Sequence, residues 1–396
     1  MIKKVTDRKY LEQIHELGSY AFNSNHTKEQ RDIYLKKNES IDNYVDEVDG
    51  QVTSQIVGYP YQVTINGQVM GMSGIGDVAT YPEARGTGSI RLLFEAIFND
   101  LHEKGTELSY LAPFSQSFYR KFGYENIFDY DEIRIPKETI VQIKPEKTGS
   151  VKRVLWENKE AQETIKELYR KTLGTHNGSL VREDYWWDFV LTFNQGRRLA
   201  IAYDDQKQAC GYIVYGLIGA SEFMIYEMSY TNLFGLKKLM TFVSSHSGSF
   251  DEFVSTNLPD PKILELFTET QNIVRKTHSS MMARIVNFKE FIEKFNFKSS
   301  PTKEIVYLEV NDSTCSWNNG IFKLSIVNGK STCEKIDPSN EAMIHYSGSI
   351  QRWTQIFMGR VTFEEAQWLN LIDSKNESTN FSELFLPSTP RLYDYF

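Results

Sequence analysis

The sequence predicts a chain of mixed α/β and α+β class, with two similar α/β domains and a smaller α+β domain. Three observations carry this prediction. Patterns typical of strands and helices alternate over residues 1–145. A similar order of elements returns over residues 146–286, which indicates an internal repeat of the fold. Residues 287–396 then change to short strands with Asn/Gly turns, followed by short helices.

The first domain is predicted to begin with a helix over residues 9–22. Residues 61–65 and 68–70 flank Asn66-Gly67, which predicts a hairpin with a type I′ turn, and residues 73–80 are predicted as the neighbouring strand. Apolar side chains recur at helical spacing in the first helix and are expected to face inward: Leu11, Ile14, Leu17 and Phe22.

The most informative segment joins a strand ending at Thr80 to an amphipathic helix predicted over residues 89–104. Between them lies the loop Arg85-Gly86-Thr87-Gly88. A helix N-terminus presents unpaired backbone N–H groups to an anion, and Arg85 adds a fixed positive charge, so this loop suits a pyrophosphate. The alternative is an ordinary glycine-rich connection. No Gly-Lys-Ser/Thr follows the loop, which excludes a Walker A motif.

The segment after this helix supplies a second candidate group. Residues 108–113 read as a strand, and residues 115–121 read as a short helix that closes at Phe122-Gly123. Tyr119 lies on this short helix. A free tyrosine has a pKa near ~10, so it is protonated at neutral pH and able to donate a proton. The alternative for Tyr119 is a packed aromatic side chain without a chemical role.

Composition narrows the class of function. A net charge of −8 without a basic stripe argues against a nucleic-acid partner. No apolar run approaches the roughly 20 residues of a membrane span, and the first residues lack the apolar core of a signal peptide. The three cysteines are expected to be reduced thiols of a cytoplasmic protein. The histidines show no HxH or HExxH spacing, so no metal site is expected.

The end of the sequence is unusual for a chain terminus. Most termini are polar and frayed, but this segment carries Pro387 and Pro390 and closes with Tyr393-Asp394-Tyr395-Phe396. We therefore expect it to be buried. It is either docked only for packing or placed to bring a carboxylate to a site.

The Arg/Gly loop and the sequence Phe118-Tyr119-Arg120-Lys121-Phe122-Gly123-Tyr124 resemble the acyl-CoA site of the GNAT (Gcn5-related N-acetyltransferase) superfamily. In the second domain, residues 225–230 correspond to the strand before the loop, but only Thr231-Asn232 follow, so this domain resembles a GNAT fold that has lost its cofactor site. Residues 287–396 resemble a sterol-carrier-protein module. The layout as a whole resembles the enhanced-intracellular-survival (Eis) family of N-acetyltransferases.

The resemblance implies acetyl-CoA as co-substrate, domains at 1–145, 146–286 and 287–396, and a homo-oligomer, by resemblance a hexamer. It places the pantetheine arm against the backbone of three strand residues, the phosphates on the loop and helix start, and two further residues beside the arm. Carried over position by position, these residues are Val78, Ala79, Thr80, Arg85, Gly86, Thr87, Gly88, Ser89, Ile90, Arg91, Phe114 and Ser115.

The same resemblance implies the chemical roles. Tyr119 would protonate the departing CoA thiolate, and the carboxylate of Phe396 would take the proton of the attacking amine. Because a free α-carboxylate has a pKa near ~3.5, it is a weak base unless it is desolvated or acts through water. Asp394 is the alternative carboxylate. The segment Asn23-Ser24-Asn25-His26 falls where GNAT folds often shape the acceptor site.

The predicted function is acetyl transfer to an amine with a broad acceptor pocket. An aminoglycoside, a polyamine or a lysine side chain would serve as acceptor, and the sequence does not choose among them. Two other classes stay open. One is a non-catalytic regulator that binds acyl-CoA through the intact loop, and the other is a lipid-binding protein that acts through the last domain.

Overall fold

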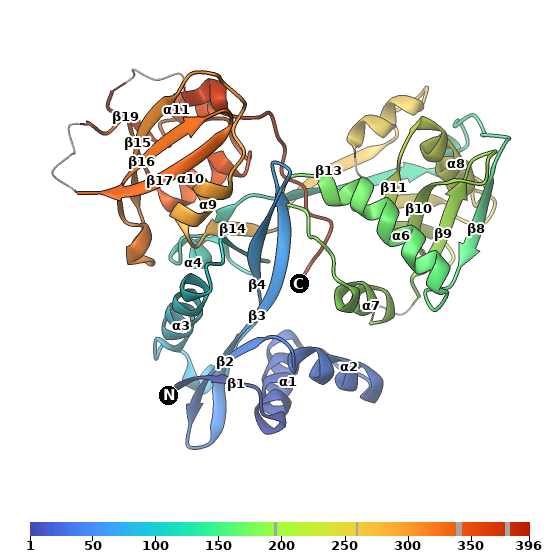
Figure 1. Cartoon of the computed structure of the whole chain (residues 1–396). Coiled ribbons are helices and arrows are strands. Elements are labelled where there is room, and N and C mark those ends of the chain that lie inside the picture. The colour runs from blue at the N-terminus through green and yellow to red at the C-terminus, as the bar shows by residue number, and fades with distance from the viewer. Residues whose placement is uncertain (194–195, 259, 338–342, 377–380) are drawn as a thin grey trace. The chain divides into compact units, whose positions relative to one another are not determined.

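The computed structural model describes residues 1–193, 196–258, 260–337, 343–376 and 381–396 (Figure 1). The chain forms two compact units. The first comprises residues 1–128, 177–182 and 280–396, and the second comprises residues 129–176 and 183–279. The described elements are those of a mixed α/β chain with three sheets, which confirms the predicted fold class.

The first unit contains a seven-stranded sheet in which β4 pairs antiparallel with β3 and parallel with β5. The turn at Asn66-Gly67 has φ of 45° and 75°, as a type I′ turn requires. The prediction of separate strands at 68–70 and 73–80 was wrong, because one long strand covers both. In spatial order the strands are β1 (Ile2–Val5), β2 (Asp42–Val48), β3 (Gln51–Ile65), β4 (Gln68–Thr80), β5 (Leu108–Leu111), β14 (Met282–Ile285) and β6 (Glu125–Asn126).

The first helix that packs on this sheet buries the apolar positions predicted from its sequence, except Phe22. Leu11, Ile14 and Leu17 are fully buried, whereas Phe22 is 56% exposed. The expectation that Phe22 faces the core was wrong, because it is the last residue of its helix and lies beyond the sheet contacts of α1. The helices are α1 (Arg8–Phe22), α2 (Lys28–Asn38), α3 (Ser89–Glu103) and α4 (Gln116–Arg120).

The second unit is built around another seven-stranded sheet with a parallel β11–β12 pair. In spatial order its strands are β13 (Val274–Ser279), β7 (Asp129–Pro136), β12 (Glu252–Ser255), β11 (Glu222–Tyr230), β10 (Ala209–Ile218), β9 (Arg198–Tyr203) and β8 (Ser150–Val154). Its helices are α5 (Lys137–Ile140), α6 (Lys159–Lys171), α7 (Asp184–Thr192) and α8 (Leu233–Ser244).

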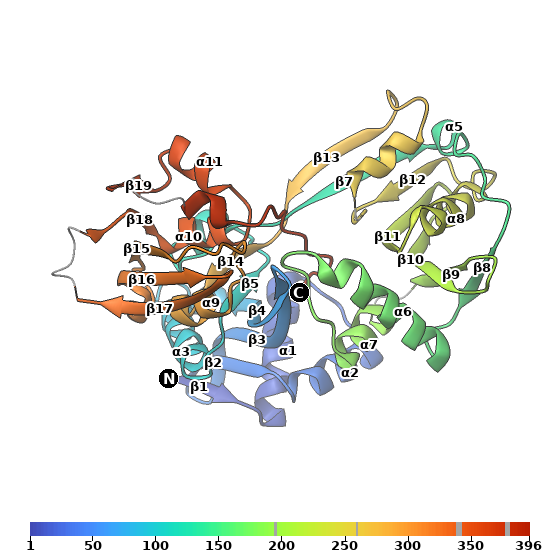
Figure 2. The same cartoon turned by 45° about the horizontal axis from the view of Figure 1, so that its top comes forward.

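A five-stranded sheet completes the first unit (Figure 2). Its strands are β17 (Lys330–Ile336), β16 (Gly320–Val327), β15 (Glu304–Asn311), β18 (Tyr346–Ser349) and β19 (Asp373–Ser374), and its helices are α9 (Phe288–Lys294), α10 (Ile350–Phe357) and α11 (Phe363–Trp368). Phenylalanine rings pack against one another beside this sheet: Phe288, Phe291, Phe295, Phe297, Phe357, Phe363, Phe381 and Phe385.

Each of the two seven-stranded sheets contains a strand that lies outside the residue range expected for its domain. Strand β7 falls within residues 1–145 but pairs in the second sheet, and β14 falls within residues 146–286 but pairs with β5 in the first. Pairing partners are chosen by three-dimensional register, which periodicity along one strand does not reveal. Over the described residues, no helix is long and apolar enough to cross a membrane.

Candidate active site

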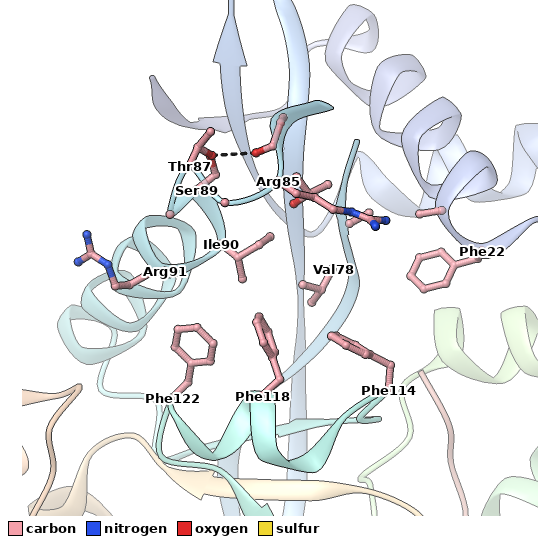
Figure 3. A pocket seen from close by; sticks show the side chains of 16 residues that line it. Phe22, Val78, Arg85, Thr87, Ser89, Ile90, Arg91, Phe114, Phe118 and Phe122 are labelled. Atoms are coloured by element: carbon pink, nitrogen blue, oxygen red, sulfur yellow. Dashed lines mark hydrogen bonds between the residues drawn. The ribbon is translucent and has the colours of Figure 1, made fainter. Parts of the chain in front are cut away.

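The site begins where β4 and β5 stop pairing. The last pair in their parallel ladder is Ile75 with Leu111, and β4 then continues to Thr80 paired with β3 on its other side but no longer with β5. A pocket of about 830 Å³ lies beside this free end of β4, with aromatic rings at its base (Figure 3). Its wall is formed by Ala21, Phe22, Val78, Ala79, Thr80, Ala84, Arg85, Gly86, Thr87, Gly88, Ser89, Ile90, Arg91, Phe114, Phe118 and Phe122.

A β-bulge lies at the inner end of this pocket. The β3–β4 register passes from Val57 with Gly76 to Gln55 with Ala79, so two residues of β4 oppose one residue of β3. Asp77, in the bulge, has a left-handed backbone with φ of 50°. A bulge frees one residue from the regular ladder and redirects its backbone, and bulges are common beside active sites.

The loop after β4 presents backbone rather than side chain to the pocket. Gly86 and Gly88 have φ of 81° and 83°, a region that glycine adopts without strain. A Cβ atom at either position would meet nothing within 4 Å, so the loop surface is open. Gly88 is the N-cap of α3, and no side chain caps the helix. The first N–H groups of α3 and its positive dipole end therefore face an open concavity suited to an anion.

Hydroxyl groups brace the loop from behind. Thr87 Oγ1 donates to the carbonyl of Ala84 at 2.9 Å and lies 2.7 Å from Ser89 Oγ. Ser89 Oγ in turn donates to Asp46 Oδ2 at 2.6 Å. Burial opposes ionisation of Asp46, but hydrogen bonds from the chain's N-terminal ammonium and Ser89 lower the net pKa of this carboxyl. The loop is thereby fixed before any ligand is present.

The two arginines of the loop differ in direction. Arg85 is exposed, and its side chain reaches along the pocket toward Phe22, whereas Arg91 points away from the pocket interior (Figure 3). Arg91 Nη1 forms an ion pair with Glu95 Oε1 at 2.5 Å. Of the two guanidinium groups, Arg85 is the one placed to meet a ligand's phosphate.

Eleven of the twelve predicted binding residues line this pocket. The twelfth, Ser115, is the N-cap of α4 and accepts a hydrogen bond from the Phe118 N–H at 3.4 Å. Thr80 Oγ1, in the pocket wall, is a buried polar atom without a hydrogen-bond partner in the described chain. The sequence analysis missed five wall residues: Ala21, Phe22, Ala84, Phe118 and Phe122.

Tyr119 lies directly behind the pocket wall. Its ring is edge-on to Phe114 and Phe118, with centroids 5.4 and 5.2 Å apart, and only 3% of the residue is exposed. Burial raises the pKa of the Tyr119 phenol above its usual value, and the nearby phenol of Tyr395 raises it further. Tyr119 therefore stays protonated across the physiological range, and the end of the chain lies close to it.

The last residue of the chain packs against β3 and β4. The ring of Phe396 lies 5.0 Å from the ring of Tyr61 and 6.3 Å from that of Tyr59, measured between centroids. The expected burial of the tail holds for Leu392, Tyr393 and Asp394, whereas Tyr395 is 74% exposed. Asp394, the alternative carboxylate, is held by Arg182 in a buried ion pair, in which Arg182 Nε lies 2.8 Å from Asp394 Oδ1.

Polar groups that the sequence analysis missed gather beside the bulge. Tyr34 donates to Asp77 Oδ2 at 2.7 Å, and Lys37 donates to the Tyr59 hydroxyl at 3.1 Å. Desolvation lowers the pKa of Lys37 to about 8, although the charge of Asp77 opposes this shift. The only hint in the sequence was the proposed acceptor segment, whose His26 Nδ1 lies 3.0 Å from His15 Nε2.

The corresponding position in the second unit is closed. Helix α8 follows β11 directly, and the Asn232 side chain caps it by accepting from the Gly235 N–H at 2.9 Å. A Cβ atom at Gly235 would lie 2.2 Å from the carbonyl oxygen of Cys210, so the helix start is pressed against β10. The start of α8 therefore differs from the start of α3, which has no side-chain cap.

Comparison with known families finds matches to three stretches of the chain. Residues 1–127 match a family described as Acetyltransferase (GNAT) domain, and residues 178–285 match a second family of the same description. Residues 288–393 match the Sterol carrier protein domain. None of the curated proteins matches the chain.

Solved structures match over the whole length. A conserved protein from Enterococcus faecalis V583, described as a probable N-acyltransferase, is 34% identical with a TM-score of 0.93, and the match covers 100% of this chain and 99% of that one. Eis1 from Mycobacterium abscessus is 15% identical with a TM-score of 0.80 and full coverage of both chains, which shows a shared fold. A GCN5-related N-acetyltransferase from Anabaena variabilis is 21% identical with a TM-score of 0.87, also with full coverage of both chains. With two acetyltransferase (GNAT) domains, a sterol carrier protein domain and a 34% identical full-length relative described as a probable N-acyltransferase, this chain belongs to the acetyltransferases of the GNAT superfamily.

Proposed function

We propose that the protein transfers the acetyl group of acetyl-CoA to a primary amine of a small polyamine or aminoglycoside-like acceptor. The observation that carries this proposal is the pocket between the free end of β4 and the uncapped N-terminus of α3. It combines an anion site with a long apolar trough, and a CoA thioester consists of a pyrophosphate joined to an extended arm. At the corresponding place in the second unit, the Asn232 side chain caps α8 and the Gly235 backbone lies against β10, which supports the pocket of the first unit as the site of transfer.

The residues of the first unit fit acetyl-CoA part by part. The N–H groups at the start of α3, together with the Arg85 guanidinium, bind the phosphates. The backbone of Val78, Ala79 and Thr80 pairs with the amides of the pantetheine arm, because this part of β4 has no β5 partner. The bulge at Asp77 then turns a backbone N–H toward the thioester carbonyl, where negative charge develops during attack.

Two groups handle the protons. The carboxylate of Phe396 accepts a proton from the acceptor ammonium, directly or through water, so that the neutral nitrogen attacks the acetyl carbon. Attack forms the C–N bond and a tetrahedral intermediate. Its collapse breaks the C–S bond as Tyr119 donates its phenolic proton to the sulfur of CoA, and the second proton of the nitrogen returns through water to the Tyr119 oxygen. The buried, protonated state of Tyr119 supports this role.

The acceptor side is built from aromatic rings. Tyr59 and Tyr61 stack with centroids 5.7 Å apart, and the Phe396 ring covers them. Aromatic faces attract ammonium groups, and the Phe396 carboxylate adds a negative charge, so a cationic amine suits this surface. The homo-oligomer implied by the family resemblance, and the cytoplasmic location expected from the three reduced cysteines, remain part of this proposal.

Two other functions are less well supported. A non-catalytic acyl-CoA sensor would need the loop but not a buried tyrosine and a seated chain end beside it. A lipid carrier would need an apolar groove in the last domain, where phenylalanine rings such as Phe357 and Phe381 instead pack against neighbouring rings.

The test is thiol-detected release of CoA from acetyl-CoA with a panel of polyamines, aminoglycosides and a lysine peptide. Native protein is compared with a variant that carries one extra Gly after Phe396, and acetyl-CoA binding is measured in both. We expect turnover by native protein, and intact binding but strongly reduced turnover in the extended variant. Equal turnover in both would remove Phe396 from the mechanism. Binding without turnover on any amine would favour the sensor.

A further inference from the structure

A short segment far from the catalytic residues in sequence holds the end of the chain. Residues 177–182, which connect α6 and α7 along the chain, lie beside the part of β3 that extends past β2. The Gly178 N–H donates to the Thr64 carbonyl at 2.7 Å, and the Val181 N–H donates to the Gln62 carbonyl at 2.8 Å. An isolated antiparallel bridge joins Val63 to Leu180. The segment thus behaves as an added edge strand of the first sheet.

The tail packs along this segment. The Arg391 N–H donates to the carbonyl of Asn177 at 2.8 Å, and Ser179 Oγ donates to the Arg391 carbonyl at 3.1 Å. The Asn177 side-chain amide also donates to the Met358 carbonyl at 2.8 Å. Backbone and side-chain hydrogen bonds therefore fix the tail as far as residue 391, five positions before the carboxylate of Phe396.

One ion pair holds the tail close to its final residue. Arg182 Nε donates to Asp394 Oδ1 at 2.8 Å, and the two side chains are 2% and 1% exposed. Burying two charges costs more than an exposed pair gains, so such a pair is weak evidence of a stabilising role by itself. Its effect on geometry is direct, because the chain spans only about 3.5 Å per residue and Asp394 is two residues from the terminus.

We propose that Arg182 is a positioning residue: through its ion pair with Asp394 it holds the Phe396 carboxylate at the acceptor amine. This inference rests on the proposed role of Phe396 as the proton acceptor. Arg182 itself touches neither acetyl-CoA nor the reacting atoms in this assignment. The alternative is that the pair only holds the fold together.

The experiment combines variants of the pair with the extended terminus. Arg182→Gln, Arg182→Lys and Asp394→Asn are each made with the native end and with one extra Gly after Phe396. For every protein, kcat, the KM for the amine, the acetyl-CoA dissociation constant and the melting temperature are measured. With the native end we expect Arg182→Gln and Asp394→Asn to lower kcat about 10- to 100-fold, as a displacement near 1 Å does. Arg182→Lys, which keeps the charge, should lose less.

The effects of the ion-pair variants and of the extra Gly on kcat should not be additive if Arg182 positions the carboxylate, and should be additive if Arg182 only stabilises the fold. If the extra Gly has already displaced the carboxylate, breaking the ion pair should cause no further loss of kcat in that background, and acetyl-CoA binding should stay unchanged throughout. Equal fold losses in both backgrounds, or no loss in the native one, would overturn the proposal. If Arg182→Gln does not fold, the same comparison is made with Arg182→Lys, whose shorter reach also shifts Asp394.

A second buried ion pair in the same unit provides the matched control. Arg284 and Asp312 are both fully buried and form an ion pair at 2.6 Å that involves no tail residue. Asp312→Asn should lower the melting temperature, and any loss of kcat should be the same fold with either terminus. If the extra Gly leaves native turnover intact, the role of Phe396 itself fails, which is a different result from additive losses at Arg182.

Discussion

The ring of Phe396 occupies the space that a side chain at Gly74 would need. A Cβ atom on Gly74 would lie 2.5 Å from Cε2 of Phe396 and 2.9 Å from Cε2 of Tyr61. Gly74 pairs with Tyr59 on one side and Tyr110 on the other, so its backbone is fixed within the sheet. The Phe396 ring therefore packs directly against Gly74. A side chain at position 74 would displace this ring rather than the strand.

Gly74→Ala should displace the Phe396 ring and lower kcat about tenfold or more, because the carboxylate moves with the ring. Acetyl-CoA affinity should stay within twofold, since Gly74 is not in the pocket wall. Steady-state kinetics and calorimetry measure the two effects. Gly248→Ala is the control, because a Cβ atom there would meet nothing within 4 Å. Unchanged kcat in Gly74→Ala would show that the seat of Phe396 does not matter to turnover.

Tyr119→Phe should lower kcat by about 10² to 10⁴, the usual contribution of a general acid, with little change in acetyl-CoA binding. Burial raises the pKa of Tyr119 above its ordinary value. The acid form therefore persists as pH rises, and native kcat should show no decline between pH 7 and about 10 from loss of this proton. A pH–rate profile provides the check. A native decline near pH 8 that disappears in Tyr119→Phe would contradict the raised pKa.

Arg85→Ala should weaken acetyl-CoA binding about tenfold, the usual effect of losing one charge-assisted hydrogen bond. The loss should shrink at high salt, because Arg85 is exposed and its charge is screened. Arg91→Ala is the control, since Arg91 is paired with Glu95 and points away from the pocket (Figure 3). Equal losses for the two variants would mean that the ligand reaches both guanidinium groups.

Lys37→Met should stabilise the protein at pH 7, with a gain that disappears above about pH 10. Desolvation lowers the pKa of Lys37 from 10.5 to about 8 in the folded chain. Between these values the unfolded chain binds more protons than the folded chain, so native stability rises with pH. The charged lysine costs at most about 3 kcal/mol at pH 7, and the lost hydrogen bond to Tyr59 offsets part of the gain.

Urea unfolding of Lys37→Met and native protein at pH 7 and pH 10 measures this difference. Lys36→Met is the control, because Lys36 is an exposed neighbour on the same helix. A gain for Lys37→Met that is the same at both pH values would indicate better packing rather than removal of a desolvated charge.

Local sequence pattern was sufficient to predict most residues that line the pocket, because these residues lie in one contiguous stretch of the chain. The end of β4, the loop and the start of α3 follow one another, and the residues that line the pocket run almost without interruption from Val78 to Arg91. Apart from Ala84, the pocket residues that were missed come from other segments of the chain. Phe22 has helical spacing with Leu11, Ile14 and Leu17, but its position at the end of α1 places it in the pocket wall.

The amino-acid pattern alone is enough to predict the fold class, the Arg/Gly loop, the short helix with Tyr119 and the aromatic character of the tail. These are local properties, set by hydrophobic period, glycine at positive φ and helix-start chemistry. Three features can be seen only in the folded chain. Strands β7 and β14 each pair in the sheet of the other domain, the Phe396 ring packs against Gly74, and Arg182 pairs with Asp394. These contacts join residues up to hundreds of positions apart, and only packing and buried-charge pairing select them, neither of which leaves a periodic trace in the sequence.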